Sequence, residues 1–248
     1  MSPTAMEPLQ PGNCLLSIII PAYNEAPTIA AVLDKVAGVS VPLRRELVIV
    51  DDGSRDATCD AVTGWIERNR QMPARLIRHA ANAGKGAAVR TGIAAATGDI
   101  LLIQDADLEY EPADYPAILE PILSGRATVV YGSRMSGRDQ SGWISRRQVL
   151  ANRLLTGLTN LLCRSNLTDM ETCYKVFRAE AVKPLRLTAC RFDIEPEITI
   201  KLLRTGQRIV EVPITYRGRG KAEGKKIDWR DGVHGIWAIV KYRFFSRL

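Results

Sequence analysis

Three acidic residues follow a short apolar stretch in the segment DILLIQDADLEYEP, residues 99–112. The apolar residues read as a buried strand, in which side chains alternate between the faces of a sheet. If the extended conformation continues, Asp105, Asp107 and Glu109 point the same way and repel one another, so a positive group is expected among them. Oxygen ligands suit hard cations such as Mg²⁺ or Mn²⁺, which complete their shells with water and phosphates. The predicted counter-charge is therefore a metal ion that carries a diphosphate.

A lysine stands between glycines in the segment NAGKGAAVRTG, which invites comparison with a phosphate-binding loop. The pattern GxxxxGK[ST] requires a glycine where this chain has His79, and a serine or threonine where it has Gly86. The segment fails at both positions. We expect a tight loop that leads into a helix, with Lys85 close to a charged ligand.

Charged residues are unevenly distributed along the 248-residue chain, whose net charge is +7. Residues 1–133 hold 11 Lys and Arg against 16 Asp and Glu, a balance of −5, whereas residues 134–248 hold 23 against 11, a balance of +12. Such an excess predicts that the second half meets an anion: nucleic acid, a phosphorylated substrate or an acidic membrane surface. A solvated basic surface is the alternative. No clustered aromatic motif for RNA accompanies the basic residues, so no nucleic-acid partner is expected.

Composition argues against several other classes of protein. The chain is 46% hydrophobic and 25% charged, which is typical of globular proteins. Its apolar runs are shorter than the roughly 20 residues needed to cross a bilayer. Two histidines argue against a histidine-based metal site, and five widely spaced cysteines without a CxxC pair predict reduced thiols in a cytoplasmic protein. Residues 1–13 lack the features of a secretory signal and are expected to form a flexible leader.

Strand and helix patterns alternate through the first half of the chain. Short apolar runs at residues 15–20, 46–51, 74–79 and 100–103 are separated by segments with helical periodicity. Repeated units of this kind predict an α/β fold with a Rossmann-like, mostly parallel sheet and helices on both faces. Ligands of such sheets gather at the carboxyl ends of the strands. The polar segments PAYNE, DDGS and DADLE all fall there and are expected to share one rim.

The second half continues as part of a single compact domain, without an apparent linker or repeat. Its patterns predict helices near residues 112–123, 146–164 and 195–205, and strands near 128–134 and 208–216. In the final stretch, WRDGVHGIWAIVKYRFFSRL, apolar residues fall on one helical face: Val233, Ile236, Trp237, Val240 and Phe244. This basic amphipathic helix, residues 231–248, is expected either to lie in a membrane interface or to dock on the domain.

Five motifs together resemble the family 2 glycosyltransferases: SIIIPAYNE, VIVDDGSRDAT, NAGKGAAVRTGI, GDILLIQDADLEYEP and YGSRM. They occur in the order and spacing of that family over roughly residues 15–228. Within the family the chain most resembles the dolichol-phosphate mannose synthases and the related polyprenyl-phosphate glucosyltransferases. The resemblance implies a GT-A fold.

The resemblance assigns the residues of the first half to a nucleotide sugar. The base and ribose would be held by Pro21, Tyr23 and Glu25 of PAYNE and by Asp52 of DDGS, with Val50 of the preceding strand lining the pocket. Asp105, Ala106 and Asp107 match the motif that binds the metal and the diphosphate, and Glu109 falls where the synthase type often has Gln. The metal ligands implied are therefore Asp105, Asp107 and Glu109.

Basic residues of the second half are assigned to phosphates by the same resemblance. Arg134 matches an arginine that contacts the donor diphosphate or the acceptor phosphate, a role that suits a bidentate donor. Arg219 and Lys226 match a flexible basic loop after one inserted residue, and Arg146 or Arg147 would add to them. Acids near the acceptor have uncertain duties, which include catalysis or the orientation of basic residues: Asp169, Glu171, Asp193 and Glu195.

The activity implied is that of a metal-dependent inverting glycosyltransferase, with Mg²⁺ or Mn²⁺ as cofactor. A hexose would move from a nucleotide diphosphate sugar, GDP-mannose or a UDP-sugar, to a polyprenyl phosphate. Asp107, Arg134 and Asp169 are the candidate catalytic residues. A phosphate monoester with a second pKa of about 6 needs no general base. The alternatives are transfer to a sugar hydroxyl, which requires a carboxylate base, and nucleotide-sugar binding without turnover.

Boundaries and location follow from the same reasoning. The glycosyltransferase domain is expected over residues 14–230, with a nucleotide-sugar half at 14–109 and an acceptor half at 110–230. A membrane-bound acceptor implies peripheral attachment to the cytoplasmic face of a membrane, through the C-terminal helix or through a membrane-protein partner.

Overall fold

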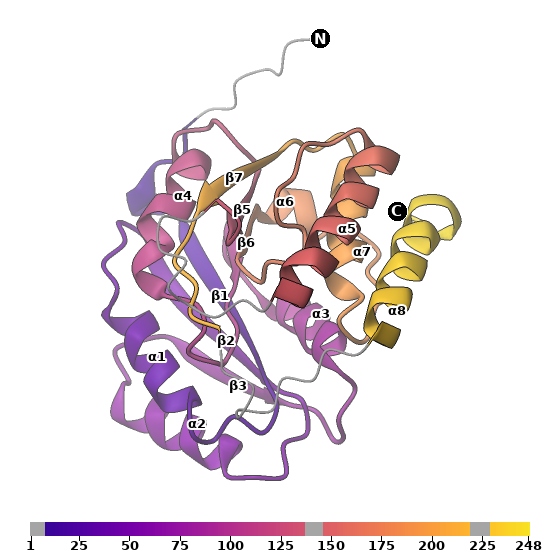
Figure 1. The fold of residues 1–248 in the computed structure, drawn as a ribbon. Coiled ribbons are helices and arrows are strands. Elements are labelled where there is room, and N and C mark those ends of the chain that lie inside the picture. The colour runs from indigo at the N-terminus through magenta and orange to yellow at the C-terminus, as the bar shows by residue number, and fades with distance from the viewer. Residues whose placement is uncertain (1–7, 137–145, 219–228) are drawn as a thin grey trace.

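A seven-stranded sheet forms the centre of the computed structural model, which describes residues 8–136, 146–218 and 229–248 (Figure 1). The strands lie in the order β3-β2-β1-β4-β6-β5-β7. Their bounds are β1 Leu15–Ala22, β2 Arg44–Asp51, β3 Ala74–Arg78, β4 Ile100–Ile103, β5 Val129–Ser133, β6 Lys175–Arg178 and β7 Ile209–Pro213.

Neighbouring strands are parallel except at β6. This strand runs antiparallel to both β4 and β5, whereas the pairs β1–β2, β1–β4, β2–β3 and β5–β7 are parallel. The predicted mostly parallel sheet is confirmed. The strand β6 lies in the segment TDMETCYKVF, whose pattern predicts no strand because only Val176 and Phe177 are apolar in its four residues.

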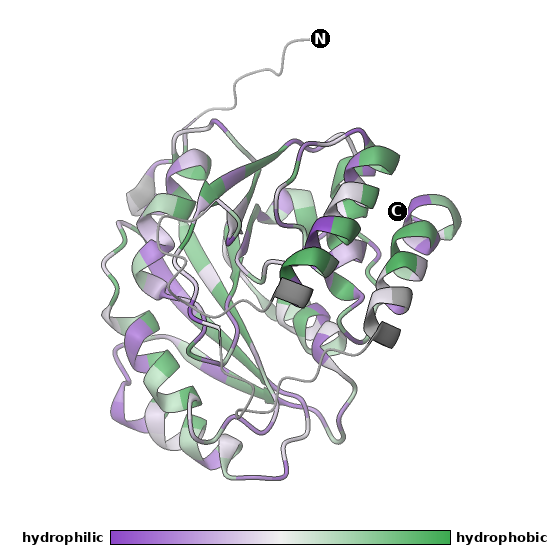
Figure 2. Ribbon diagram, in the orientation of Figure 1, coloured by the Kyte–Doolittle hydropathy of each residue, from purple (hydrophilic) through white to green (hydrophobic). Residues whose placement is uncertain are grey.

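Helices cover the sheet on both faces. Figure 1 shows α1, α2 and α4 on one side of the sheet, and α3, α5, α7 and α8 on the other. The strands between them carry much of the hydrophobic colour in Figure 2, as expected for a sheet buried on both faces. The helix bounds are α1 Ile29–Gly38, α2 Thr58–Arg68, α3 Lys85–Ala95, α4 Tyr115–Leu123, α5 Arg146–Cys163, α6 Ala179–Val182, α7 Ile194–Arg204 and α8 Trp229–Val240.

The helical periodicity of the sequence corresponds to the faces that pack. In α1 the buried residues are Ile29, Val32, Leu33 and Val36, which confirms the predicted spacing. The helix α3 instead approaches the sheet through small residues. A Cβ atom on Gly92 would lie only 2.2 Å from Cγ2 of Ile19 in β1, so only glycine allows this close contact.

The end of β4 differs from the expectation drawn from the acidic segment. The strand stops at Ile103, and the chain bends instead of continuing in an extended conformation. Gln104 anchors this change of direction, because its buried Oε1 accepts hydrogen bonds from the hydroxyls of Tyr115 (2.7 Å) and Tyr174 (2.8 Å). Alternation therefore does not extend beyond Gln104, and it cannot place the three acids on one face.

Both ends of the described chain are attached to the domain. The Leu9 backbone N–H donates to the Leu123 carbonyl at 3.1 Å, so the end of the expected leader is bonded to α4. The helix α8 packs against α5 and α7, and Ile239 and Tyr242 are fully buried, which confirms docking of the terminal helix. None of the helices in the described ranges combines the length and hydropathy that a membrane span requires.

Close packing at Gly92 leads to a test of stability. Gly92→Ala should lower the free energy of unfolding by about 1–3 kcal/mol, since overpacking in the core outweighs the better helix propensity of alanine. The matched control is Gly157→Ala in α5, where nothing lies within 4 Å of the added Cβ. This control should stabilise the protein by about 0.5–1 kcal/mol. Urea denaturation of both variants measures the difference, and equal effects would contradict the packing argument.

Candidate active site

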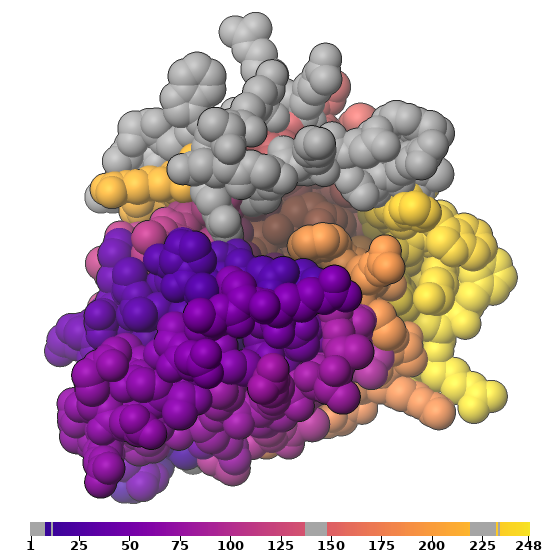
Figure 3. Space-filling model, turned by 90° about the horizontal axis from the view of Figure 1, so that it is seen from below, coloured from indigo at the N-terminus to yellow at the C-terminus, as the bar shows by residue number. Residues whose placement is uncertain are grey.

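Loops that follow β1, β2 and β4 meet at one end of the sheet, as expected for parallel strands. The Asn24 backbone N–H donates to the Ser54 hydroxyl at 2.9 Å, and the Thr28 hydroxyl oxygen lies 3.0 Å from the Ala106 carbonyl oxygen. The segments PAYNE, DDGS and DADLE therefore share one rim. In Figure 3, which looks onto this end from below, the surface is hollowed between the indigo and purple residues of the first half and the orange residues of the second.

The turn after β1 is fixed by hydrogen bonds that leave a ring exposed. Asn24 has a positive φ of 54°, which asparagine tolerates better than most residues, and its side chain accepts the Arg55 N–H at 2.8 Å. The Glu25 carboxylate accepts the Thr28 hydroxyl at 2.6 Å. The Tyr23 side chain, 40% exposed, can pack against a planar group at the rim.

Pro21 and Val50 have a different position from the other residues assigned to the nucleotide. They face each other in the register of β1 and β2, and both are buried. Their side chains therefore belong to the floor beneath the rim.

Asp52 organises the loop between β3 and α3. Its Oδ1 accepts hydrogen bonds from His79 Nδ1 (2.7 Å) and from the Ala83 N–H (3.0 Å). Its Oδ2 accepts from Asn82 Nδ2 (2.9 Å) and from the Gly84 N–H (2.7 Å). Because each oxygen already has two donors, the carboxylate holds the loop in this structure and has little remaining capacity for a ligand.

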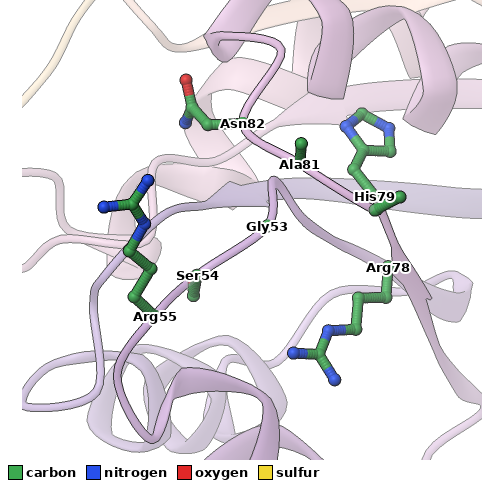
Figure 4. A pocket seen from close by; sticks show the side chains of 8 residues that line it. Gly53, Ser54, Arg55, Arg78, His79, Ala81 and Asn82 are labelled. Carbon is green, nitrogen blue, oxygen red and sulfur yellow. The ribbon is translucent and has the colours of Figure 1, made fainter.

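A pocket of about 520 Å³ opens between the loops that follow β2 and β3. Figure 4 shows Gly53 in its middle and the arginines Arg55 and Arg78 on either side. The wall is completed by Ser54, His79, Ala80, Ala81 and Asn82. Gly53 is required there, because it has a φ of +70° and an added Cβ would lie 2.6 Å from the Ala81 backbone. The pocket therefore combines a backbone floor with two cationic side chains.

Glycines on both sides of Lys85 let its backbone approach the second half of the chain. A Cβ added to Gly84 would lie 2.3 Å from the Cys190 carbonyl oxygen, and a Cβ added to Gly86 would lie 2.7 Å from the Ala189 carbonyl oxygen. Lys85 begins α3, and its ammonium lies 2.8 Å from Asp105 Oδ1 and 3.3 Å from Glu195 Oε1. The positive group expected among the acids is thus, in this structure, a lysine of the chain itself.

The expected convergence of three acids is not found among the described residues, which contain no group of three His, Cys, Asp or Glu that could hold a metal. Glu109 is 2% exposed, and its Oε2 accepts the Tyr216 hydroxyl at 2.6 Å. Asp107 Oδ1 accepts the Glu109 N–H at 3.1 Å, which closes a tight turn after Asp105. The bend after β4 therefore directs Glu109 towards the chain that follows β7.

The remaining pair of acids fits a hard divalent cation. Asp105 and Asp107 supply carboxylate oxygens at the rim, and the Asp105 side chain is 21% exposed. An ion such as Mg²⁺ is typically bound through one or two carboxylates, with water and substrate phosphates as its other ligands. The chemistry of this donor set suits such an ion with two protein carboxylates, without Glu109.

The partly buried Arg134 and the buried Asp169 form a bidentate ion pair. Nε and Nη2 of Arg134 lie 2.7 Å and 2.8 Å from the two carboxylate oxygens, and the Arg134 backbone N–H donates to Asp169 Oδ2 at 2.9 Å. Asn152 Nδ2 also donates to this carboxylate at 2.8 Å, and the guanidinium lies 5.2 Å from the centroid of the Tyr216 ring. Burial by itself would raise the pKa of Asp169, but the charge and hydrogen bonds of Arg134 hold it below its ordinary value. Asp169 is therefore ionised, and its carboxylate orients Arg134.

Other acids of the second half also have partners. Asp193 Oδ2 accepts the Tyr242 hydroxyl at 2.7 Å, and Glu195 forms ion pairs with Lys85 and with the fully buried Lys175. Glu171 is half-buried, and burial together with the nearby charge of Glu195 raises its pKa to about 7.

Two residues of the site escape prediction from the sequence. Lys175 lies in the unpredicted strand β6, and Tyr216 follows β7; both fall in segments that resemble the family, TDMETCYKVFRAE and VPITYRGRGKAEGKKI, but neither residue is assigned a role there. Two predicted residues, Arg219 and Lys226, lie outside the described residues, as do the side chains of Arg146 and Arg147 at the start of α5.

Comparison with known proteins extends over most of the chain. The family model described as Glycosyl transferase family 2 matches residues 17–186. A dolichol-phosphate mannosyltransferase of Pyrococcus furiosus is 30% identical over 92% of this chain, which spans 64% of that protein's length. A dolichyl-phosphate beta-glucosyltransferase of Dictyostelium discoideum is also 30% identical, over 94% of this chain and 75% of its own length.

Solved structures share the fold. Glucosyl-3-phosphoglycerate synthase from Mycobacterium tuberculosis, crystallised with Mn²⁺, uridine diphosphate and phosphoglyceric acid, superposes with a TM-score of 0.71 at 21% identity. The match covers 95% of this chain and 80% of that one. The GT-A fold predicted from the sequence is confirmed by this likeness.

The saturation of Asp52 leads to a test of its structural role. Asp52→Asn replaces one acceptor oxygen by an NH₂ group that would face N–H donors, so it should lower the free energy of unfolding by about 1–3 kcal/mol. Hydrogen exchange at the Ala83 and Gly84 amides should also become faster. Asp60→Asn, at an exposed acid of α2, is the matched control and should change neither quantity. Unchanged exchange in Asp52→Asn would contradict the proposed anchoring of the loop.

Proposed function

The chain belongs to glycosyl transferase family 2, and from this premise we propose that it transfers a hexose from a nucleotide diphosphate sugar to a polyprenyl phosphate. The observation that carries the proposal is the arrangement at one rim of an acidic pair, Asp105 and Asp107, and a partly buried, rigidly held guanidinium, Arg134. The acids suit a metal-bound diphosphate, and the arginine suits a second phosphate. The names of the two relatives at 30% identity, a dolichol-phosphate mannosyltransferase and a dolichyl-phosphate glucosyltransferase, support this choice of acceptor.

On the donor side, we assign the nucleoside to the exposed ring of Tyr23 and the adjoining pocket beside Arg55. Ser54 and Arg55 line this pocket and bond directly to the turn that carries Tyr23. The diphosphate would lie at Asp105 and Asp107, with Mg²⁺ or Mn²⁺ as the shared ion. Such an ion, when bound, neutralises negative charge that develops on the leaving diphosphate.

On the acceptor side, a phosphate monoester is a nucleophile that is already ionised near neutral pH, since its second pKa is about 6. The chain then needs a cation to position the acceptor and no general base. Arg134 suits this role, because its pair with Asp169 uses Nε and Nη2 and leaves Nη1 outside the bidentate contact. Because the guanidinium is already fixed, little additional conformational entropy is lost when a phosphate binds.

Transfer to a sugar hydroxyl is the second candidate, and it is less well supported. Three acids are candidates for a general base: Asp169, Asp193 and Glu195. Each of them already accepts a hydrogen bond or forms an ion pair within the protein. Glu171, with a pKa of about 7, has the proton affinity of a general base. If Glu171→Gln abolished transfer to a hydroxyl acceptor and polyprenyl phosphate were inert, this second function would replace the first.

We also propose that the protein attaches peripherally to the membrane that holds the acceptor. The helix α8 and the turn after it expose Trp237 (58%), Phe244 (59%) and Phe245 (75%), and α5 exposes Leu150, Leu154 and Leu161. Basic residues such as Arg243 lie among these aromatic residues, which is typical of interfacial helices. The same proposal places the protein on the cytoplasmic face of the membrane and includes attachment through a membrane-protein partner.

The decisive experiment incubates the protein with a panel of nucleotide sugars, MnCl₂ and a polyprenyl phosphate, and looks for a lipid-linked sugar by mass spectrometry. A lipid-linked hexose that depends on the metal is expected. Absence of product with every donor, from a protein that binds the nucleotides, would overturn the proposed acceptor.

Loss of the Arg134 guanidinium gives a quantitative prediction. Arg134→Ala should reduce kcat/KM for transfer to polyprenyl phosphate at least 10-fold, or about 1.4 kcal/mol of transition-state stabilisation. Arg126→Ala removes an exposed arginine that pairs with Glu120, so it serves as the control and should leave transfer unchanged. Equal rates in Arg134→Ala and in the wild type would show that Arg134 does not bind the acceptor.

Attachment to a membrane is tested by substitution, because deletion of residues 231–248 would also remove the buried Ala238, Ile239 and Tyr242. The triple variant Trp237→Ser, Phe244→Ser and Phe245→Ser should lose sedimentation with anionic liposomes at low salt, since these side chains provide the apolar contact. Nucleotide binding, measured by calorimetry, should survive. Sedimentation equal to that of the wild type would refute the attachment through α8. Neutral liposomes are the control, because basic residues each gain about 1 kcal/mol only near an anionic surface.

A further inference from the structure

Lys85 has two carboxylate partners, and one of them is an acid assigned to the metal. Its ammonium lies 2.8 Å from Asp105 Oδ1 and 3.3 Å from Glu195 Oε1, and its side chain is 18% exposed. We propose that Lys85 is a placeholder cation, which neutralises Asp105 until a divalent ion binds and then turns to the donor diphosphate while Glu195 retains it beside the site. This inference rests on the proposed function, because it assumes that Asp105 receives the ion.

The backbone of Lys85 is fixed, so only its side chain is able to move. Gly84 and Gly86 pack against the backbone of residues 189–191, and the Ala87 N–H donates to the Cys190 carbonyl at 3.1 Å. The ammonium is attached to four flexible methylene groups, which allow it to exchange one oxygen partner for another nearby. A fixed backbone with a flexible charged end is what a placeholder requires.

Glu195 is held as a stationary second partner. Its other oxygen, Oε2, forms an ion pair with Lys175, which is fully buried. Lys175 Nζ also donates to the carbonyls of Met170 (3.0 Å) and Thr172, so its three N–H groups all have acceptors. Because Lys175 cannot leave without an unpaired buried charge, Glu195 remains in place when Lys85 exchanges its partner.

Charge balance gives the direction of the exchange. In the structure described here, Lys85 and Lys175 compensate Asp105 and Glu195. Burial by itself lowers the pKa of Lys85, but the charges of Asp105 and Glu195 outweigh it and raise the pKa well above its ordinary value, so the ammonium stays charged. A divalent ion on Asp105 would repel this ammonium, and the donor diphosphate supplies the negative charge that it then needs. Lys85 should therefore weaken binding of the ion alone and strengthen binding of the nucleotide.

Opposed changes in two affinities test the proposal. Lys85→Met should bind Mn²⁺ alone about 10-fold more tightly than the wild type, equivalent to about 1.4 kcal/mol, because Asp105 loses a competing cation. The same variant should bind UDP and GDP about 10-fold more weakly without metal, because the diphosphate loses an ammonium. Titration with MnCl₂, followed by the paramagnetic resonance signal of free Mn²⁺, and calorimetry with the nucleotides give the two values.

Controls separate a placeholder from a structural lysine. Lys35→Met removes an exposed lysine that pairs with Glu111 at 2.7 Å, and it should change neither affinity. Lys85→Arg keeps the charge and should not tighten Mn²⁺ binding. Lys85→Gln replaces Lys85→Met if the apolar variant does not fold. The proposal is overturned if a folded Lys85→Met or Lys85→Gln variant binds Mn²⁺ no more tightly than the wild type does.

Failure of the proposed function would be distinguishable from failure of this inference. If the two affinities shift in opposite directions but no lipid-linked sugar is formed, Lys85 is a placeholder in an enzyme with another acceptor. If lipid-linked sugar is formed but the affinities do not shift in this way, the acceptor is correct and the role of Lys85 is wrong.

Discussion

Buried charges at the rim of the sheet must be compensated, and this constraint connects the two halves of the chain. Asp105 follows β4, Lys85 begins α3, Glu195 lies in the first turn of α7, and Lys175 begins β6. Alternating charges join these elements in a single row. Because an unpaired charge in such a partly or fully buried position is destabilising, these ion pairs couple the packing of the first half of the chain to that of the second.

Other parts of the rim follow the same rule of paired polar groups. Asp52 holds the loop before α3 through donors on both of its oxygens, and Asp169 holds Arg134 through two parallel hydrogen bonds. Glu109 holds the chain after β7 through the Tyr216 hydroxyl. Acids that resemble ligands in the sequence thus position the loops and cations around the site. Positioned cations are what the proposed reaction of two phosphate-bearing substrates would require, since such substrates repel each other.

The helix α8 and the helical turn Lys241–Phe245 after it combine two demands. Ile239 of α8 and Tyr242 of the turn pack against the domain, whereas Trp237 of α8 and Phe245 of the turn remain exposed. Arg204 fixes the turn after α8 by donating to the carbonyls of Tyr242 (2.7 Å) and Ser246 (2.9 Å). The helix and this turn therefore present their exposed rings from a rigid support, which is consistent with the proposed attachment to a membrane.

Local sequence patterns were enough to predict the parallel sheet, the buried face of α1 and the meeting of PAYNE, DDGS and DADLE at one rim. These features depend on strand alternation, helical periodicity and parallel strand direction, which are properties of short segments. The strand β6 could not be predicted, since it has few apolar residues and depends on its place between β4 and β5. The partners of the acids were likewise decided only by the tertiary structure. Lys85 is 20 residues from Asp105 and 110 from Glu195 along the chain, so no spacing indicates their contact. Charge compensation acts through space, and only the folded chain determines which charges meet.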